Sequence, residues 1–201
     1  MNSRATTDFP VSDVIAQRWS PYAFADRPVS REDLQSLFEA ARWAPSSYNE
    51  QPWSYLVATR EDAAAFATLL SCLVEGNQQW AKAAPVLALG CTRLNFVRDG
   101  RPNAAAVHDL GLASAGLLVE ATTRGLAVHQ MIGILPDRAR QIYQVPEGVQ
   151  PLTGLAIGYA GDPAALPKQL RSRDAARRTR KPVQEFVFSG KWGTVSGLVS
   201  K

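Results

Sequence analysis

The sequence predicts an α+β fold in which helices cover both faces of a sheet. One observation is that short runs of apolar and β-branched residues, which are typical of buried strands, recur along the chain. Another is that other segments space their apolar residues as an amphipathic helix does. The two kinds of segment alternate irregularly, which argues against a regularly wound parallel fold.

A helix is expected at residues 31–42. Ser30 can cap it, and the carboxylates of Glu32 and Asp33 suit its first turn. By the same reasoning we expect further helices at 61–73, 104–125 and 136–143, and strands at 53–59, 85–91, 126–131, 151–159 and 183–188.

The expected helix at 104–125 is unusually dense in small residues between positions 111 and 116, including Gly111 and Gly116. Each glycine costs a helix about 1 kcal/mol relative to alanine, so some other interaction must offset the loss. Close approach of another helix would do so.

Length and composition indicate one folded domain over residues 1–201. The chain has 201 residues, of which 46% are hydrophobic, and no repeat or low-complexity linker divides it. The two cysteines, Cys72 and Cys91, form no Cys-x-x-Cys pair and lie far from the histidines in sequence, so neither a disulfide scaffold nor a zinc site is expected.

No targeting segment is expected either. Residues 1–9 contain no apolar stretch of a signal peptide. The apolar segment at 104–121 carries Asp109 and Glu120, whereas a membrane span needs about 20 predominantly apolar residues. We therefore expect a soluble, cytoplasmic protein without a membrane partner.

The positive charge of the chain is concentrated in one segment. The formal charge is +4, from 22 basic and 18 acidic residues, and residues 168–181 hold seven of the basic and one of the acidic residues. The remaining chain has 15 basic and 17 acidic residues. A nucleic-acid-binding protein would carry a basic face on its folded body as well, so no nucleic-acid partner is expected.

Residues 44–53 combine polar side chains with two prolines between a helix end and a strand start. Hydroxyl and amide groups on such a turn can hydrogen-bond a flat polar heterocycle, although the same composition also suits an ordinary turn. The candidate binding residues here are Pro45, Ser46, Ser47, Asn49 and Gln51.

Two further segments suit a phosphate group. The segment Arg18-Trp19-Ser20-Pro21-Tyr22 places a cation and a hydroxyl two residues apart. Arg178 and Arg180 would share one face of an extended segment and present two guanidinium groups to an anion. A solvated charged tail is the alternative interpretation of the basic segment.

Residues 125–133 form an apolar run that ends in a glycine. His129 within it is either a packed, hydrogen-bonded histidine or a base. The sequence contains no nucleophile triad, paired-carboxylate site, GxGxxG or Walker motif, so the chemistry is expected to come from a cofactor.

These motifs together resemble those of the FMN-dependent nitroreductase family from Arg18 to about Val187. Residues 44–53, Ala-Pro-Ser-Ser-Tyr-Asn-Glu-Gln-Pro-Trp, match the family's Ala-Pro-Ser-x-x-Asn-x-Gln-Pro-Trp loop in full. Arg18-x-Ser20 and Arg178-x-Arg180-Lys-Pro182 are similar to its two phosphate motifs, and Asp109-Leu-Gly-Leu-Ala113 is similar to the start of its central dimer helix.

The resemblance implies a mixed central sheet flanked by helices and an intertwined homodimer with FMN at the interface. A C-terminal arm, about 183–201, would reach across to the partner. The FMN-binding residues implied in addition to the loop and the phosphate motifs are Trp19, Tyr22, Asn77, Met131, Ile132 and Gly133. Tyr22 stands where the family usually has a second basic residue.

The implied activity is that of an NAD(P)H-dependent flavin oxidoreductase. In a ping-pong cycle, NAD(P)H gives a hydride to flavin N5 and leaves, and a nitroaromatic, quinone or similar electron-poor acceptor then takes its place. No catalytic side chain is expected. The alternatives are an enzyme of the same fold that uses reduced FMN on oxygen or in dehalogenation, and a non-catalytic flavin-binding protein.

Overall fold

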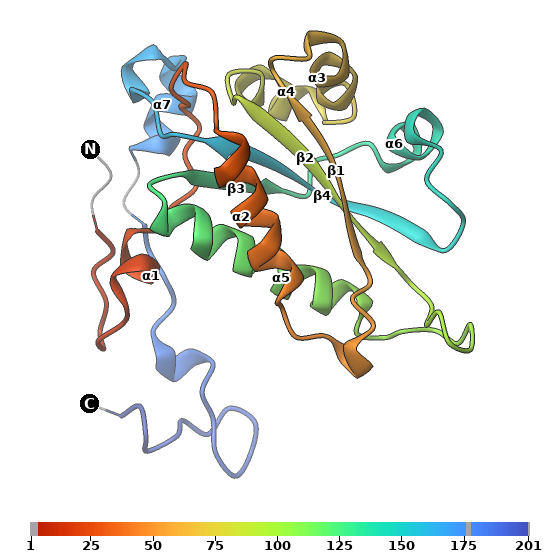
Figure 1. The fold of residues 1–201 in the computed structure, drawn as a ribbon. Coiled ribbons are helices and arrows are strands. Elements are labelled where there is room, and N and C mark those ends of the chain that lie inside the picture. Colours follow the sequence, from red (N-terminus) through yellow and green to blue (C-terminus); the bar gives the residue numbers. More distant parts are fainter. Residues whose placement is uncertain (1–3, 176–177, 201) are drawn as a thin grey trace.

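A computed structural model describes residues 4–175 and 178–200. Its helices are α1 (Asp13–Gln17), α2 (Arg31–Arg42), α3 (Ala63–Leu70), α4 (Glu75–Ala81), α5 (Ala106–Thr123), α6 (Pro136–Tyr143) and α7 (Lys168–Asp174) (Figure 1). Its strands are β1 (Trp53–Thr59), β2 (Val86–Arg93), β3 (Ala127–Met131) and β4 (Val149–Gly158). The expected α+β fold is confirmed.

The strands form one sheet in the order β1-β2-β4-β3. All pairs between these named strands are antiparallel, so the expectation of a mixed sheet is wrong for the described part of the chain. The reason lies in the connections. Thr59 at the end of β1 pairs with Val86 at the start of β2, because α3 and α4 return the chain to the end of the sheet from which it left.

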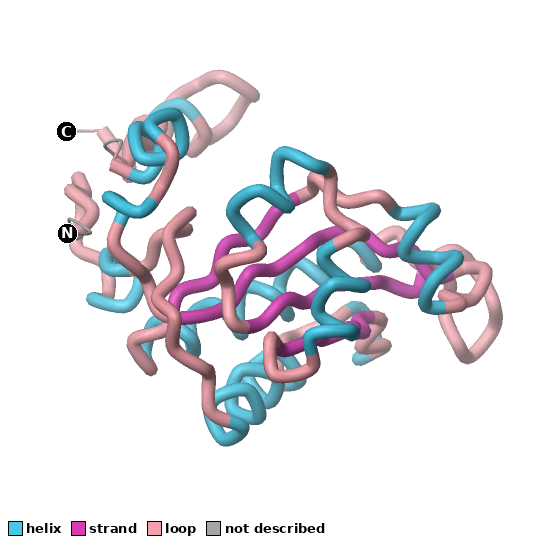
Figure 2. The backbone as a smooth tube through the Cα atoms, turned by 90° about the horizontal axis from the view of Figure 1, so that it is seen from above, coloured by secondary structure: helices cyan, strands magenta, loops and turns pink. Residues whose placement is uncertain are grey.

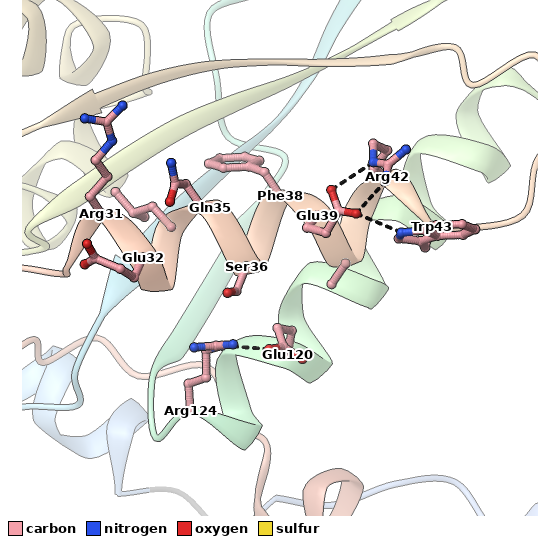
Figure 3. Close-up of a pocket in the computed structure, with 12 residues that line it drawn as sticks. Arg31, Glu32, Gln35, Ser36, Phe38, Glu39, Arg42, Trp43, Glu120 and Arg124 are labelled. Carbon is pink, nitrogen blue, oxygen red and sulfur yellow. Dashed lines mark hydrogen bonds and ion pairs between the residues drawn. The ribbon is translucent and has the colours of Figure 1, made fainter.

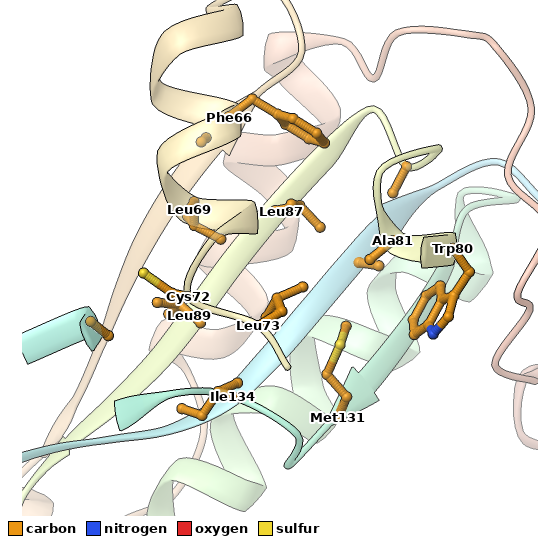
Figure 4. Packing of buried hydrophobic residues seen from close by; sticks show 14 of the residues in the cluster. Phe66, Leu69, Cys72, Leu73, Trp80, Ala81, Leu87, Leu89, Met131 and Ile134 are labelled. Carbon is orange, nitrogen blue, oxygen red and sulfur yellow. The ribbon is translucent and has the colours of Figure 1, made fainter. Parts of the chain in front are cut away.

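Helices lie on both sides of the strands (Figure 2). On one face, α2 and α5 pack against side chains such as Val86 and Ala88 of β2. On the other face, α3 and α4 pack against the alternate residues Leu87 and Leu89 (Figure 4). Because successive strand side chains point to opposite faces, a strand covered on both sides lacks the alternation of polar and apolar residues, as β2 does from Val86 to Cys91.

Helices α2 and α5 approach each other closely at a glycine. A Cβ atom placed on Gly116 would lie 2.9 Å from the carbonyl oxygen of Ala40 on α2. The expectation that small residues in this helix admit a neighbouring helix is therefore confirmed at Gly116. Gly111, in contrast, lies on the exposed side of α5 and has no such neighbour within 4 Å.

The expected strand at 183–188 is wrong. Val183–Glu185 form a 3-10 turn directly after Pro182, and Phe188 makes only an isolated bridge with Val195. Strand propensity takes effect only where a neighbouring strand supplies packing and hydrogen bonds. The segment instead leads away from the sheet, as Figure 1 shows.

The helices were also compared with the length and hydropathy of a membrane span. Among residues 4–175 and 178–200, no helix has the length and hydropathy needed to cross a bilayer.

Candidate functional site

A cluster of guanidinium groups lies at residues 18–22, the segment that the sequence suggests as a phosphate-binding candidate. Arg18 follows α1 directly and is half-buried, and its Nη1 donates to Ser20 Oγ over 3.5 Å. Burial lowers the pKa of Arg18, and the positive charges of Arg180 and Arg178 lower it further. Residues 160 positions apart in sequence are thus brought together, and their charges repel one another.

Arg178 also fixes the geometry of this cluster. Its guanidinium donates to the backbone carbonyls of Arg18 and, over 3.0 Å, of Ala16. Burial and the charge of Arg180 lower the pKa of Arg178. Arg180 is exposed, and its Nη1 donates to the carbonyl of Thr179 over 2.7 Å. The arrangement concentrates positive charge and hydrogen-bond donors at one place, which suits a phosphate dianion.

The rest of the N-terminal motif is anchored in the core. Trp19 is partly buried, and the ring of Tyr22 packs edge-on against Trp80 and His129, with centroid distances of 5.1 and 4.8 Å. The backbone N–H of Tyr22 donates to Oδ1 of the buried Asp174 over 2.6 Å. Tyr22 therefore contributes apolar packing as well as its phenol group.

His129 is packed and hydrogen-bonded. Its Nδ1 donates to the carbonyl of Pro21 over 2.9 Å, and its ring lies 4.4 Å from that of Trp80. Burial lowers the pKa of His129, which keeps the imidazole neutral near pH 7. These contacts favour the interpretation of His129 as a packed histidine that holds residues 18–22 against β3.

The chain leaves β3 through Met131, Ile132 and Gly133. Met131 is buried, whereas Ile132 is 71% exposed. Asn77 Nδ2 donates to the carbonyl of Gly133 over 2.9 Å, and the backbone N–H of Val74 donates to the same oxygen over 3.1 Å. A Cβ on Gly133 would collide with the Asn77 amide, so this close approach requires glycine.

The loop at 44–53 is strained and internally hydrogen-bonded. Tyr48, Asn49 and Gln51 have φ angles of 53°, 55° and 50°. Gln51 donates through its backbone N–H to Ser46 Oγ over 3.0 Å and through Nε2 to the carbonyl of Asn49 over 2.9 Å. Non-glycine residues in this left-handed region are concentrated at ligand sites and switch regions of proteins.

Most polar groups of this loop are accessible. Pro45, Asn49 and Gln51 are exposed, and Ser46 and Ser47 are partly buried. The loop is held from below by Asp109, whose Oδ2 accepts a hydrogen bond from the Ser47 backbone N–H. The sequence predicts Asp109 near the start of this helix but does not assign it this contact. The signal that could have found it is a carboxylate in the first turn of a mainly apolar helix.

The candidate residues fall into two groups within one chain. The first group surrounds β3: Arg18, Trp19, Ser20, Tyr22, Asn77, Met131, Ile132, Gly133, Arg178 and Arg180. The second is the loop before β1. Met131 pairs with Gly154, Gly154 with Leu89, and Leu89 with Leu56, so β1 and β3 are separated by about 14 Å across the sheet.

Two surface hollows lie elsewhere. One, of about 1060 Å³, is an open depression along the outer side of α2 and the end of α5 (Figure 3). Its polar side chains pair with each other, as Glu39 does with Arg42 and Trp43. The other, of about 390 Å³, lies between residues 28–29, 59–61 and 85–86. Neither contains a candidate binding residue.

A profile described as the nitroreductase family matches residues 15–159. The chain belongs to the nitroreductase family. The match includes residues 18–22, the loop at 44–53 and the exit of β3, and it ends before Arg178 and Arg180.

The chain is also similar to individual proteins and solved structures. A crystal structure described as an oxidoreductase containing FMN is 34% identical, with a TM-score of 0.89 over 96% of this chain and 98% of its own. An uncharacterized 15.4 kDa protein from the ask 5' region of Mycolicibacterium smegmatis is 37% identical over 67% of this chain and 90% of its own length. A Stenotrophomonas maltophilia protein named as a NADH dehydrogenase/NAD(P)H nitroreductase is 29% identical over 72% of this chain and 81% of its own.

Proposed function

We propose that this protein is an FMN-dependent oxidoreductase that uses NAD(P)H to reduce electron-poor acceptors such as nitroaromatics and quinones. Membership of the nitroreductase family supports the reaction class. The similar structure described as containing FMN, and a Bacillus subtilis relative named as an NAD(P)H-dependent FMN reductase, support the cofactor and the co-substrate. The observation that carries the proposal for this chain is the cluster of Arg18, Arg178 and Arg180.

The chemistry of the residues fits FMN. The guanidinium cluster and the Ser20 hydroxyl suit a phosphate group, which carries a charge of about −2 at neutral pH. The backbone N–H groups of Ile132 and Gly133, and the side chains of Asn49 and Gln51, would bind the flat polar ring system. When bound, FMN supplies the hydride chemistry that protein side chains lack.

The net reaction transfers one hydride, which carries two electrons. With a quinone, NAD(P)H and a proton yield NAD(P)⁺ and a quinol. We propose that the nicotinamide and the acceptor occupy the same place in turn, which gives ping-pong kinetics. The protein's contribution is to bind and orient both, and to hold positive charge at the phosphate end of the site.

The two groups of candidate residues support a homodimer. Within one chain, the loop before β1 and the strand β3 lie at opposite edges of the sheet. We propose that they meet between two copies, with the loop of one chain against the β3 edge of the other. The exposed side of α5 carries Val107, Gly111 and Ala115, small enough for close packing against a second helix.

The C-terminal segment is the second feature that supports this homodimer. Trp192 is 94% exposed and Leu198 is 92% exposed within one chain. Large apolar side chains in such positions indicate an interaction surface. We propose that residues 183–200, the described part of the arm, cover the partner.

Purification and visible absorbance test the cofactor. We expect a yellow protein whose bound FMN is lost more readily in Arg180→Ala, because this variant lacks one of the positive charges proposed to bind the phosphate. Arg180 is exposed, so its removal should spare the fold. Arg173→Ala, in the exposed part of α7, is the matched control and should retain FMN. A protein that stays colourless after FMN is added would refute the proposal. Bound FMN that neither nicotinamide reduces would instead indicate a non-catalytic flavin-binding protein.

A further inference from the structure

Three side chains on two neighbouring loops form an exposed cluster that the proposed function does not use. We call Tyr48, Phe96 and Arg98 the aromatic rim. The rings of Tyr48 and Phe96 meet edge to face, with centroids 5.8 Å apart. The Arg98 Cζ lies 4.4 Å from the Tyr48 centroid and 4.9 Å from the Phe96 centroid. Within one chain, Tyr48 nevertheless remains 76% exposed.

The aromatic rim is built on a hydrogen-bonded framework. Glu50 Oε1 accepts from the backbone N–H of Val97 over 2.6 Å, which fastens the loop of Tyr48 to the loop of Phe96 and Arg98. Within the second loop, the backbone N–H of Phe96 donates to the carbonyl of Arg101 over 2.9 Å. Asp99 accepts from both Arg98 and Arg101. The exposed ring of Tyr48 and the partly buried ring of Phe96 are therefore held in place.

The position of Tyr48 is costly for the backbone. Its φ angle of 53° is one that asparagine and glycine adopt far more readily than a bulky aromatic residue. The strained loop thus directs a large ring outward. Because little of its apolar surface is buried within the chain, burial offsets little of the backbone strain. An exposed aromatic ring in this conformation is consistent with a role in binding.

The charges around the aromatic rim are positive in sum. The loop at 93–103 carries Arg93, Arg98 and Arg101 against one acid, Asp99, and Glu50 on the neighbouring loop adds a second. The net charge is +1. An electron-rich phenol ring stacks well on an electron-poor planar ring, and a guanidinium beside it favours a carboxylate on that ring.

We propose that the aromatic rim selects electron-poor planar acceptors that carry a negative charge, such as a carboxylated nitroaromatic or quinone. The inference rests on the proposed function, because Tyr48 belongs to the same loop as the candidate FMN-binding residues Ser47 and Asn49. Tyr48 provides the stacking surface, and Arg98 provides the charge. Both are specificity-determining residues, since the redox chemistry belongs to the cofactor.

The first test compares para-nitrobenzoate with para-nitrobenzamide as acceptors for the FMN-loaded protein. In Arg98→Gln the ratio of kcat/KM for the anion to that for the amide should fall about three- to fivefold, the factor that an exposed ion pair is worth. Arg101→Gln removes a neighbouring charge that also pairs with Asp99 but contacts neither ring, and it should leave the ratio nearly unchanged. An equal ratio in wild type and Arg98→Gln overturns the proposal.

The stacking role is tested at Tyr48. Tyr48→Asn removes the ring and suits the backbone conformation, so this variant should fold at least as well as wild type. It should raise the KM of both acceptors by similar factors without loss of FMN. Tyr48→Phe keeps the ring and should keep both KM values. If Tyr48→Asn leaves both KM values unchanged, the ring is not a stacking surface.

Equilibrium binding provides a readout that does not depend on turnover. Calorimetric titration should show tighter binding of benzoate than of benzamide to the wild-type protein, and no such preference in Arg98→Gln. The preference can be measured even in a protein that does not reduce nitroaromatics. Absence of FMN or of NAD(P)H oxidation would therefore count against the proposed function, whereas equal binding of benzoate and benzamide to the wild type would count against the aromatic rim.

Discussion

The backbone N–H of Ser47 donates a hydrogen bond of 3.0 Å to Oδ2 of Asp109, across 62 positions of sequence. Asp109 is 2% exposed and lies in the first turn of α5. Its Oδ1 contacts Nδ1 of His108 at 3.2 Å. A buried carboxylate thus supports the strained loop that carries Ser46, Asn49 and Gln51.

We expect Asp109→Ala to destabilise the protein by about 1–3 kcal/mol, because a partly buried backbone N–H loses its acceptor. The free energy of unfolding in urea measures this loss, and titration with FMN should show weaker binding in the same variant. His108→Ala is the control. It removes an exposed side chain at Asp109 Oδ1 and leaves the Ser47 hydrogen bond to Oδ2 in place, so this substitution should cost much less. Equal stability of Asp109→Ala and wild type would show that the hydrogen bond is not needed to hold the loop.

A second prediction concerns the close approach of α2 and α5 at Gly116. Gly116→Ala places a methyl group 2.9 Å from the carbonyl of Ala40, and the two helices must move apart. Overpacking of this kind costs about 1–3 kcal/mol. Gly76→Ala, in α4 where nothing lies within 4 Å, is the control and should be neutral or stabilising. Thermal unfolding of both variants measures the difference, and equal midpoints would contradict the close helix contact.

Local signals in the sequence predicted most of the fold. Ser30 accepts a hydrogen bond over 3.0 Å from the backbone N–H of Asp33, three positions later, as expected of the residue that caps α2. The bounds of α2, β1 and α6 agree with expectation because each has its own periodicity, cap or proline. Such features depend on residues a few positions apart, which is the range over which sequence patterns are informative.

The remaining features depend on contacts between distant residues. The strands β1 and β2 are antiparallel because of where α3 and α4 return the chain, which no local pattern records. The N–H of Tyr22 finds its acceptor on Asp174, 152 positions later, and the basic segment from 168 begins as helix α7. The loop at 44–53 and the β3 edge were both predicted as binding regions, but their separation within one chain became visible only in the structure.

The cap of α2 gives a third prediction. Ser30→Ala removes the side-chain oxygen that accepts from Asp33, and we expect a loss of about 1 kcal/mol in the free energy of unfolding. Ser36→Ala, within the same helix, is the matched control and should be neutral or slightly stabilising, because alanine has the higher helix propensity. Chemical denaturation compares the two, and a loss as large in Ser36→Ala would argue against a capping effect.

The pH dependence of stability gives a fourth prediction, through His129. Burial between Tyr22 and Trp80 lowers the pKa of His129 in the folded state below its ordinary value of 6.5, although the charge of Asp174 opposes the shift. The unfolded chain therefore binds the proton more readily than the folded protein does. Stability from neutral His129 is fully present above about pH 6.5 and is lost as the pH falls below that value.

We expect the thermal midpoint of the wild type to fall between pH 7.5 and pH 5.5 by more than that of His129→Asn. Asparagine offers an amide donor near the position of Nδ1, so it can retain the hydrogen bond to Pro21 without taking up a proton in this range. Parallel pH profiles for wild type and His129→Asn would mean that His129 is protonated equally well in the folded and unfolded states, which burial against two aromatic rings argues against.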